Sequence, residues 1–156
     1  MEHSAVDRVK AVIQKVRTFK GLSVVEAAKL ISICELRNFV KRETVWEAGD
    51  PTTELLVLVN GRLLTTSVKG TVLGHIEPGN TVGEIGMLSG RPRSANVIAE
   101  EASSGFIIQK RSLNALFVSD QKLKLKVYEN LVAIMCDRLL EANARIEKLN
   151  ATDDEM

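Results

Sequence analysis

The sequence predicts a mixed α+β fold that is mainly β: an eight-stranded jelly roll, or double-stranded β-helix barrel, with N-terminal helices and one long C-terminal dimerisation helix. Apolar residues follow a helical period before Glu35 and again after Ser119. Between them lie about eight short segments rich in β-forming residues and separated by turn residues. This spacing is typical of a jelly roll and not of a parallel sheet.

Two helices are expected before the strands. Residues 1–18 are assigned to an N-terminal helix, because valine and isoleucine recur there at helical spacing. Ser23, followed three positions later by Glu26, matches a capping box and predicts a second helix of about ten residues. Residues 19–118 form the central β-unit in this interpretation. Within it, Asn60-Gly61 between two apolar runs most clearly predicts a β-hairpin.

The C-terminal part carries a heptad pattern. Residues 119–150 are expected to hold a hinge and the long helix, and the acidic residues 151–156 a disordered tail. Apolar residues at both core positions of successive heptads predict a seam that pairs two chains as a parallel homodimer. The alternative is a helix lying wholly on its own β-unit. The predicted seam consists of Leu125, Tyr128, Val132, Met135, Leu139, Ala142, Ile146 and Leu149.

Composition limits the classes of function. The chain has 156 residues, 45% of them hydrophobic, and a formal net charge of +1, so no strong attraction to nucleic acid or membranes is expected. The first residues lack a signal-peptide apolar run, and two cysteines are too few for a disulfide framework. We expect a cytoplasmic protein.

Residues 82–97, VGEIGMLSGRPRSANV, hold the candidate site. Their three glycines are too dense for a helix or strand interior, where each costs about 0.5–1 kcal/mol relative to alanine. They let backbone N–H groups converge on an anion, and Arg93 adds a bidentate grip on phosphate oxygens. Glu84 would repel a phosphate but can accept a hydrogen bond from a sugar hydroxyl. An anion site beside a hydroxyl acceptor indicates a nucleotide.

This stretch resembles the phosphate-binding cassette of the cyclic nucleotide-binding domain family, as in catabolite-activator-type regulators and kinase regulatory subunits. The family pattern opens with F-G-E-(L/I)-A and closes with P-R-(S/T/A)-A, where this chain has VGEIG and PRSA. Upstream, VWEAGDPTTELLVLVNGRL and EPGNTVGE resemble the family's strands and turns, so the resemblance covers residues 19–148. Val82 departs from the usual aromatic residue, and Gly86 from the commoner alanine.

The resemblance implies a role for each cassette residue. Glu84, with Gly83, would bind the ribose 2′-hydroxyl, and Arg93 would hold the exocyclic oxygens of the cyclic phosphate. The residues expected on the phosphate side are Arg93, Ser94, Ile85, Gly86 and Ala95.

The resemblance also implies that the long helix reads the base, from polar residues one turn after an arginine-leucine pair. Here Arg138-Leu139 is followed by Asn143, whose amide can pair with the N6 amino group and N7 of adenine. Ser94 accepts either nucleotide, whereas threonine there would favour cyclic GMP in this family. Cyclic AMP is therefore the expected ligand, ahead of cyclic GMP.

The expected function is a cyclic nucleotide receptor or regulatory module that couples ligand binding to movement of its C-terminal helix and to a downstream protein partner. No enzyme activity, metal or cofactor is expected. Direct DNA binding is not expected either, because no helix-turn-helix segment follows the long helix. Two alternatives remain open: a scaffold of the same fold that binds no ligand or a cyclic dinucleotide, and a sensor fragment of a larger transcription regulator.

Overall fold

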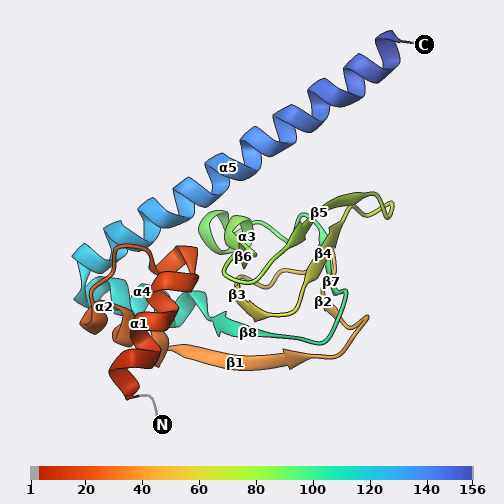
Figure 1. Cartoon of the computed structure of the whole chain (residues 1–156). Coiled ribbons are helices and arrows are strands. Elements are labelled where there is room, and N and C mark those ends of the chain that lie inside the picture. The colour runs from red at the N-terminus through yellow and green to blue at the C-terminus, as the bar shows by residue number, and fades with distance from the viewer. Residues whose placement is uncertain (1–3, 156) are drawn as a thin grey trace.

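The computed structural model describes residues 4–155, which form two four-stranded sheets, a group of helices beside them, and one long helix (Figure 1). The helices before the sheets are α1 (Ala5–Lys15), the 3₁₀ turn η1 (Arg17–Phe19) and α2 (Val24–Ser32). The strands are β1 (Cys34–Phe39), β2 (Thr44–Trp46), β3 (Leu55–Asn60), β4 (Leu63–Thr66), β5 (Val72–Ile76), β6 (Thr81–Val82), β7 (Asn96–Ala99) and β8 (Ser103–Ile108). The remaining helices are α3 (Glu84–Ser89), α4 (Lys110–Ser119) and α5 (Gln121–Asp154).

The eight strands of the described chain confirm the mixed α+β class, but they do not close into a barrel. One sheet has the order β1-β8-β3-β6 and the other β2-β7-β4-β5. Both sheets are antiparallel. The eight strands of the expected jelly roll or β-helix barrel are therefore present, but the barrel is not closed: within residues 4–155, the strand pairings leave β1 and β6 as edges of one sheet and β2 and β5 as edges of the other.

Strand β3 connects the two parts of the hydrophobic core, because both of its faces are buried. Leu55 and Val57 belong to the cluster that packs against the helices. Leu56 and Leu58 belong to the cluster between the sheets. Successive side chains of a strand point to opposite faces, so this one apolar strand stabilises both layers.

The turn at Asn60-Gly61 does not close a hairpin. β3 pairs with β6 and β8, whereas β4 pairs with β5 and β7, so this turn carries the chain from one sheet to the other. Gly61 has a φ of 92°, and a Cβ there would lie 2.1 Å from Ser103 Oγ. This close approach requires glycine, and the predicted hairpin is wrong at this position.

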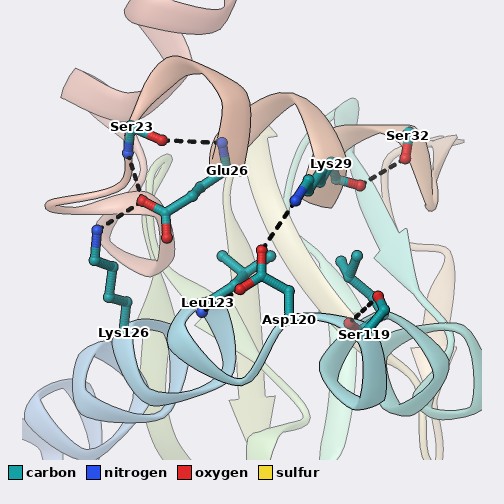
Figure 2. A network of polar contacts seen from close by, with 9 residues as sticks. Ser23, Glu26, Lys29, Ser32, Ser119, Asp120, Leu123 and Lys126 are labelled. Atoms are coloured by element: carbon teal, nitrogen blue, oxygen red, sulfur yellow. Dashed lines mark hydrogen bonds and ion pairs between the residues drawn. The ribbon is translucent and has the colours of Figure 1, made fainter.

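Two ion pairs fix the start of α5 to α2 (Figure 2). Lys126 Nζ lies 2.6 Å from Glu26 Oε1, and Lys29 Nζ lies 3.1 Å from Asp120 Oδ2. Glu26 also completes the capping box with Ser23, which confirms the predicted start of that helix. Asp120 is the N-cap of α5, so the expected hinge coincides with the junction between α4 and α5.

Acid is expected to weaken this network. The hydrogen bond from Lys126 holds the pKa of Glu26 below its ordinary value of 4.5. A carboxyl group whose pKa is lowered by folding contributes stability above its unfolded pKa and loses it as the pH falls through the folded pKa. We therefore expect Glu26→Gln to reduce the free energy of unfolding at neutral pH and to have little effect in strong acid. Denaturant titrations at both pH values measure this difference, and an equal effect at both would contradict it.

Helix α5 is continuous over 34 residues, a length of about 50 Å at 1.5 Å per residue. Its N-terminal half buries Leu123, Val127, Leu131 and Ile134, whereas its C-terminal end extends away from the sheets (Figure 1). The disordered tail expected at residues 151–156 is wrong for residues 151–154, which continue the helix. No helix within residues 4–155 has the combination of length and apolar character needed to span a membrane.

Candidate functional site

A cavity of about 320 Å³ lies between the sheets and α5, and three parts of the chain form its walls. The cassette (residues 82–97) contributes Val82, Gly83, Glu84, Ile85, Gly86, Arg93, Ser94, Ala95 and Val97. The β4–β5 hairpin and β2 contribute Thr65, Leu73, Gly74, His75, Ile76 and Trp46. Helix α5 contributes Arg138, Glu141, Ala142 and Arg145. The structure thus brings all the cassette residues that were expected to touch a ligand to one cavity.

Glu84 is the first residue of α3 and is only 3% exposed. Gly83, the residue before it, has a φ of 93°. A Cβ there would lie 2.7 Å from Arg93 Nη1, so the backbone conformation and the nearby Arg93 side chain both require glycine at this position. Thr81 Oγ1 donates to Glu84 Oε2 at 3.4 Å, and Arg138 of α5 donates to Oε1. Each carboxylate oxygen can accept two hydrogen bonds, so Glu84 retains acceptor capacity for a ligand hydroxyl.

Arg93 is 5% exposed, and three oxygen atoms hold its guanidinium. Nε donates to Thr52 Oγ1 at 3.1 Å, Nη1 to the Gly83 carbonyl at 3.2 Å, and Nη2 to the Glu54 carbonyl at 2.7 Å. The guanidinium carbon lies 3.6 Å from the ring centroid of Trp46. Burial lowers the pKa of Arg93, and the nearby Glu54 carboxylate opposes that shift. Arginine nevertheless remains charged in proteins.

The backbone beside Arg93 offers further donors. The first intrahelical hydrogen bond of α3 runs from the Met87 N–H to the Gly83 carbonyl at 3.1 Å, so the N–H groups of Ile85 and Gly86 precede the helix ladder. A Cβ at Gly86 would lie 3.1 Å from Arg93 Nη1, which is tighter than ordinary contact. An alanine at this position would need the Arg93 side chain to shift by a few tenths of an ångström.

Helix α5 presents a polar face to the cavity, and Arg138, Glu141 and Arg145 on this face were not among the expected site residues. Arg138 donates to Glu84 and to the Thr81 carbonyl. Burial, with the nearby charge of Arg17, lowers the pKa of Arg138. One and two turns further along α5 are the cavity residues Glu141 and Arg145. Glu141 lies three residues after Arg138, and Arg145 lies four residues after Glu141. This helical spacing was the signal that could have identified the face.

Asn143 does not belong to this face. It is exposed and is not among the residues that line the cavity of its own chain. Five residues beyond Arg138, it points about 140° away around the helix axis. The expected position of Asn143 at the pocket is therefore corrected: within one chain, Glu141 and Arg145 are the polar α5 side chains nearest in sequence that face the cavity.

Arg145 also binds the β4–β5 hairpin. Its guanidinium donates to the Leu73 carbonyl and, at 3.1 Å, to the Val72 carbonyl. Within residues 4–155, Glu141 has no hydrogen-bonded or ion-paired partner among the side-chain contacts. Helix α5 thus contacts the cavity through one arginine at the cassette and another at the hairpin, with a free carboxylate between them.

The predicted dimer seam is largely uncovered in the single chain. Tyr128 and Met135 are half-buried, and Ala142 is exposed. The larger apolar members, each 55–67% exposed, are Leu125, Val132, Leu139, Ile146 and Leu149. A helix lying wholly on its own β-unit would bury these side chains, so the structure does not support that alternative. An open apolar groove of about 450 Å³ runs between α3 and α5, lined by Ile85, Val132, Met135 and Leu139 among others.

Two antiparallel sheets and a long helix thus enclose a cavity lined by the buried Glu84 carboxylate and the buried Arg93 guanidinium. The chain belongs to the cyclic nucleotide-binding domain family, whose sequence profile matches residues 36–120. This match covers more than half of the chain and confirms the resemblance carried by the cassette.

Solved structures and curated proteins show the same relationship. A cyclic nucleotide-binding domain from Methylobacillus flagellatus has a TM-score of 0.81 at 22% identity, over 92% of this chain and 83% of that one. The catabolite activator protein of Thermus thermophilus has a TM-score of 0.72 at 25% identity, over 86% of this chain and 63% of that one. Glutaminase 1 of Bradyrhizobium diazoefficiens is 29% identical over 133 residues, which are 85% of this chain and 22% of that protein. The chain therefore spans about a fifth of the length of such curated relatives.

Proposed function

We propose that this chain is a non-catalytic receptor module for a cyclic nucleotide, with cyclic AMP as its ligand. One observation carries the proposal: Arg93 is 5% exposed, lines the cavity, and has no anionic partner among the ion pairs of residues 4–155. A buried charge that forms no ion pair is costly, and the nearby Glu54 carboxylate only partly offsets the burial of Arg93. A ligand phosphate would supply the missing ion pair.

The other cassette groups complete a binding site of the same chemistry. The N–H groups of Ile85 and Gly86, with the backbone and hydroxyl of Ser94, would donate to the cyclic phosphate. Glu84, held by Arg138 and 3% exposed, would accept a hydrogen bond from the ribose 2′-hydroxyl. The remaining wall, formed by the hairpin and α5, is left for the base.

The contacts of α5 favour adenine as the base. The unpaired Glu141 carboxylate can accept a hydrogen bond from the N6 amino group of adenine. Arg145 donates to two hairpin carbonyls, which hold its guanidinium at the hairpin. The regulatory domain of PKA from Toxoplasma gondii, whose solved structure contains cAMP, shares the fold.

Arg138 would couple ligand binding to α5. This arginine holds the same carboxylate that we assign to the ribose, so an incoming hydroxyl shares or displaces that contact. Because α5 begins at a helix junction, a change at Glu84 can shift an existing equilibrium between positions of α5. We propose that the exposed seam pairs two chains as a parallel homodimer and that the output passes to a partner protein or a linked domain.

Titration with cyclic nucleotides tests the proposal. We expect cyclic AMP to bind with saturable heat in calorimetry and to raise the melting temperature, because a ligand at 100 times its dissociation constant adds about 2.7 kcal/mol of stability. Cyclic GMP is expected to bind more weakly. Stabilisation by cyclic di-GMP alone would favour a cyclic-dinucleotide sensor, and no stabilisation by any of the three would favour a ligand-free scaffold.

Two neighbouring positions on α5 provide a matched pair for the base assignment in the same titration. Glu141→Ala is expected to reduce the preference for cyclic AMP over cyclic GMP, by about fivefold for one lost hydrogen bond. Asn143→Ala, on the outer side of the helix, is the control and is expected to leave the preference unchanged. A loss confined to Asn143→Ala would instead indicate that a second copy of the chain supplies the base contact.

A further inference from the structure

We propose that Trp46 and Glu54 are positioning residues, which hold the Arg93 guanidinium in its phosphate-binding orientation before any ligand arrives. The identity of the ligand rests on the proposed function, but the positioning itself is a property of the free protein. Neither residue belongs to the cassette, and Trp46 lies in the hydrophobic cluster between the sheets.

Arg93 has more N–H donors than its protein partners use. A guanidinium has five N–H groups, and those of Arg93 already satisfy a hydroxyl and two backbone carbonyls. Two N–H groups, one on each terminal nitrogen, remain for an anion. Because three contacts hold the plane of the guanidinium, the direction of the two remaining N–H groups is set in the absence of phosphate.

Trp46 supplies the fourth restraint. Its ring is 4% exposed, and the guanidinium carbon of Arg93 stacks 3.6 Å from its centroid. A cation above an aromatic face is attracted by the ring quadrupole, and the attraction is stronger when the pair is shielded from water. The ring therefore stabilises a buried cation that makes no ion pair within residues 4–155.

Glu54 connects the ring to the arginine. Its carboxylate Oε1 accepts from Trp46 Nε1 at 3.2 Å, and its backbone carbonyl accepts from Arg93 Nη2 at 2.7 Å. Gln109 and Arg37 donate to the same carboxylate, at 2.9 and 3.1 Å. Glu54 is itself fixed by residues outside the cavity, so it holds both the stacked ring and the guanidinium in one arrangement.

This arrangement lowers the entropic cost of binding. A free arginine side chain loses rotamer freedom when a ligand fixes it, and an arginine that is fixed beforehand does not incur that cost when the ligand binds. Removing the restraint is therefore expected to weaken binding although neither Trp46 nor Glu54 donates to the phosphate.

The ligand-free protein gives the first test. We expect the Nε–H resonance of Arg93, assigned by its loss in Arg93→Lys, to exchange slowly with water and to be displaced by the ring current of Trp46. In Trp46→Leu the ring-current displacement should vanish and exchange should accelerate. A rapidly exchanging, undisplaced Arg93 resonance in the wild-type protein would overturn the proposal, whether or not a nucleotide binds.

Binding of cyclic AMP gives the second test. Trp46→Leu is expected to weaken binding about tenfold, and Trp46→Phe, which keeps a ring but loses the N–H, about threefold. Because Glu54→Gln acts through the same contact, combining it with Trp46→Phe should weaken binding by less than the product of the two single effects. Arg91→Ala, at an exposed position two residues from Arg93, is the control and should stay within about twofold of wild type.

The outcomes separate this proposal from the proposed function. Wild-type affinity in Trp46→Leu and Trp46→Phe, with both variants folded by their amide spectra, would overturn the positioning role while cyclic nucleotide binding stands. A wild-type protein that shows the displaced Arg93 resonance but binds no cyclic nucleotide would retain the positioning role and contradict the proposed function. Trp46 is the only tryptophan, so its fluorescence should also respond to ligand in the wild type and not in Arg93→Ala.

Discussion

Arg93→Ala is expected to abolish cyclic nucleotide binding while the protein remains folded. The side chain is 5% exposed, and we assign it the only ion pair with the ligand phosphate. Removing one partner of a buried, hydrogen-bonded charge pair costs about 2–5 kcal/mol, which corresponds to a loss of affinity of roughly 30-fold to several thousandfold. Isothermal titration calorimetry with cyclic AMP measures the loss.

The fold should tolerate this change, because the alanine no longer buries a charge without a counter-charge. The melting temperature and amide spectrum provide that check. Arg91→Ala, two residues away and exposed, is the matched control and should bind as the wild type does. Arg93→Lys should retain only part of the affinity, since lysine lacks the planar fork that holds two oxygens. Wild-type affinity in Arg93→Ala would contradict the assignment of the phosphate site.

The cassette could be predicted from the sequence because its information is local. Its glycines, Glu84 and Arg93 lie within twelve residues of one another, and the chemistry of each depends on that spacing. The partner of Glu84 could not be predicted in the same way. Arg138 is 54 positions away, and its heptad position indicates only a helix rim. Which rim residue reaches the cassette depends on how α5 crosses the sheets.

The fold shows the same division between local and non-local information. The capping box at Ser23 is a local pattern, and the structure confirms it. The sequence analysis continues the β-unit to residue 118, whereas Lys110–Ser119 form α4. This short helix has no side-chain N-cap and buries only Leu113 and Phe117, so its helical signal is weak. The turn at Asn60-Gly61 was predicted correctly, because its signal is local. The prediction that β3 and β4 pair across this turn was wrong, because strand pairing depends on distant parts of the chain.

Leu139→Glu is expected to convert the proposed dimer into a monomer. Leu139 is 63% exposed in the single chain, near the middle of a seam whose apolar side chains recur every three and four residues along α5. Each fully buried leucine contributes about 1.5–3 kcal/mol, and the two-fold symmetry of a homodimer counts each substitution twice. The new carboxylates would also face each other across the seam, where an unpaired buried charge is costly.

Sedimentation velocity measures the result, with a control on the same helix. Leu140 is 66% exposed and adjacent in sequence, but it lies outside the heptad seam. Leu140→Glu should therefore keep the sedimentation coefficient of the wild type, whereas Leu139→Glu should sediment as a single chain. If the wild type and both variants all sedimented as single chains, the proposal that α5 pairs two chains would be contradicted. If both variants dissociated, the interface would be broader than the predicted seam, because a helix pair that buries only the a and d positions leaves Leu140 in water.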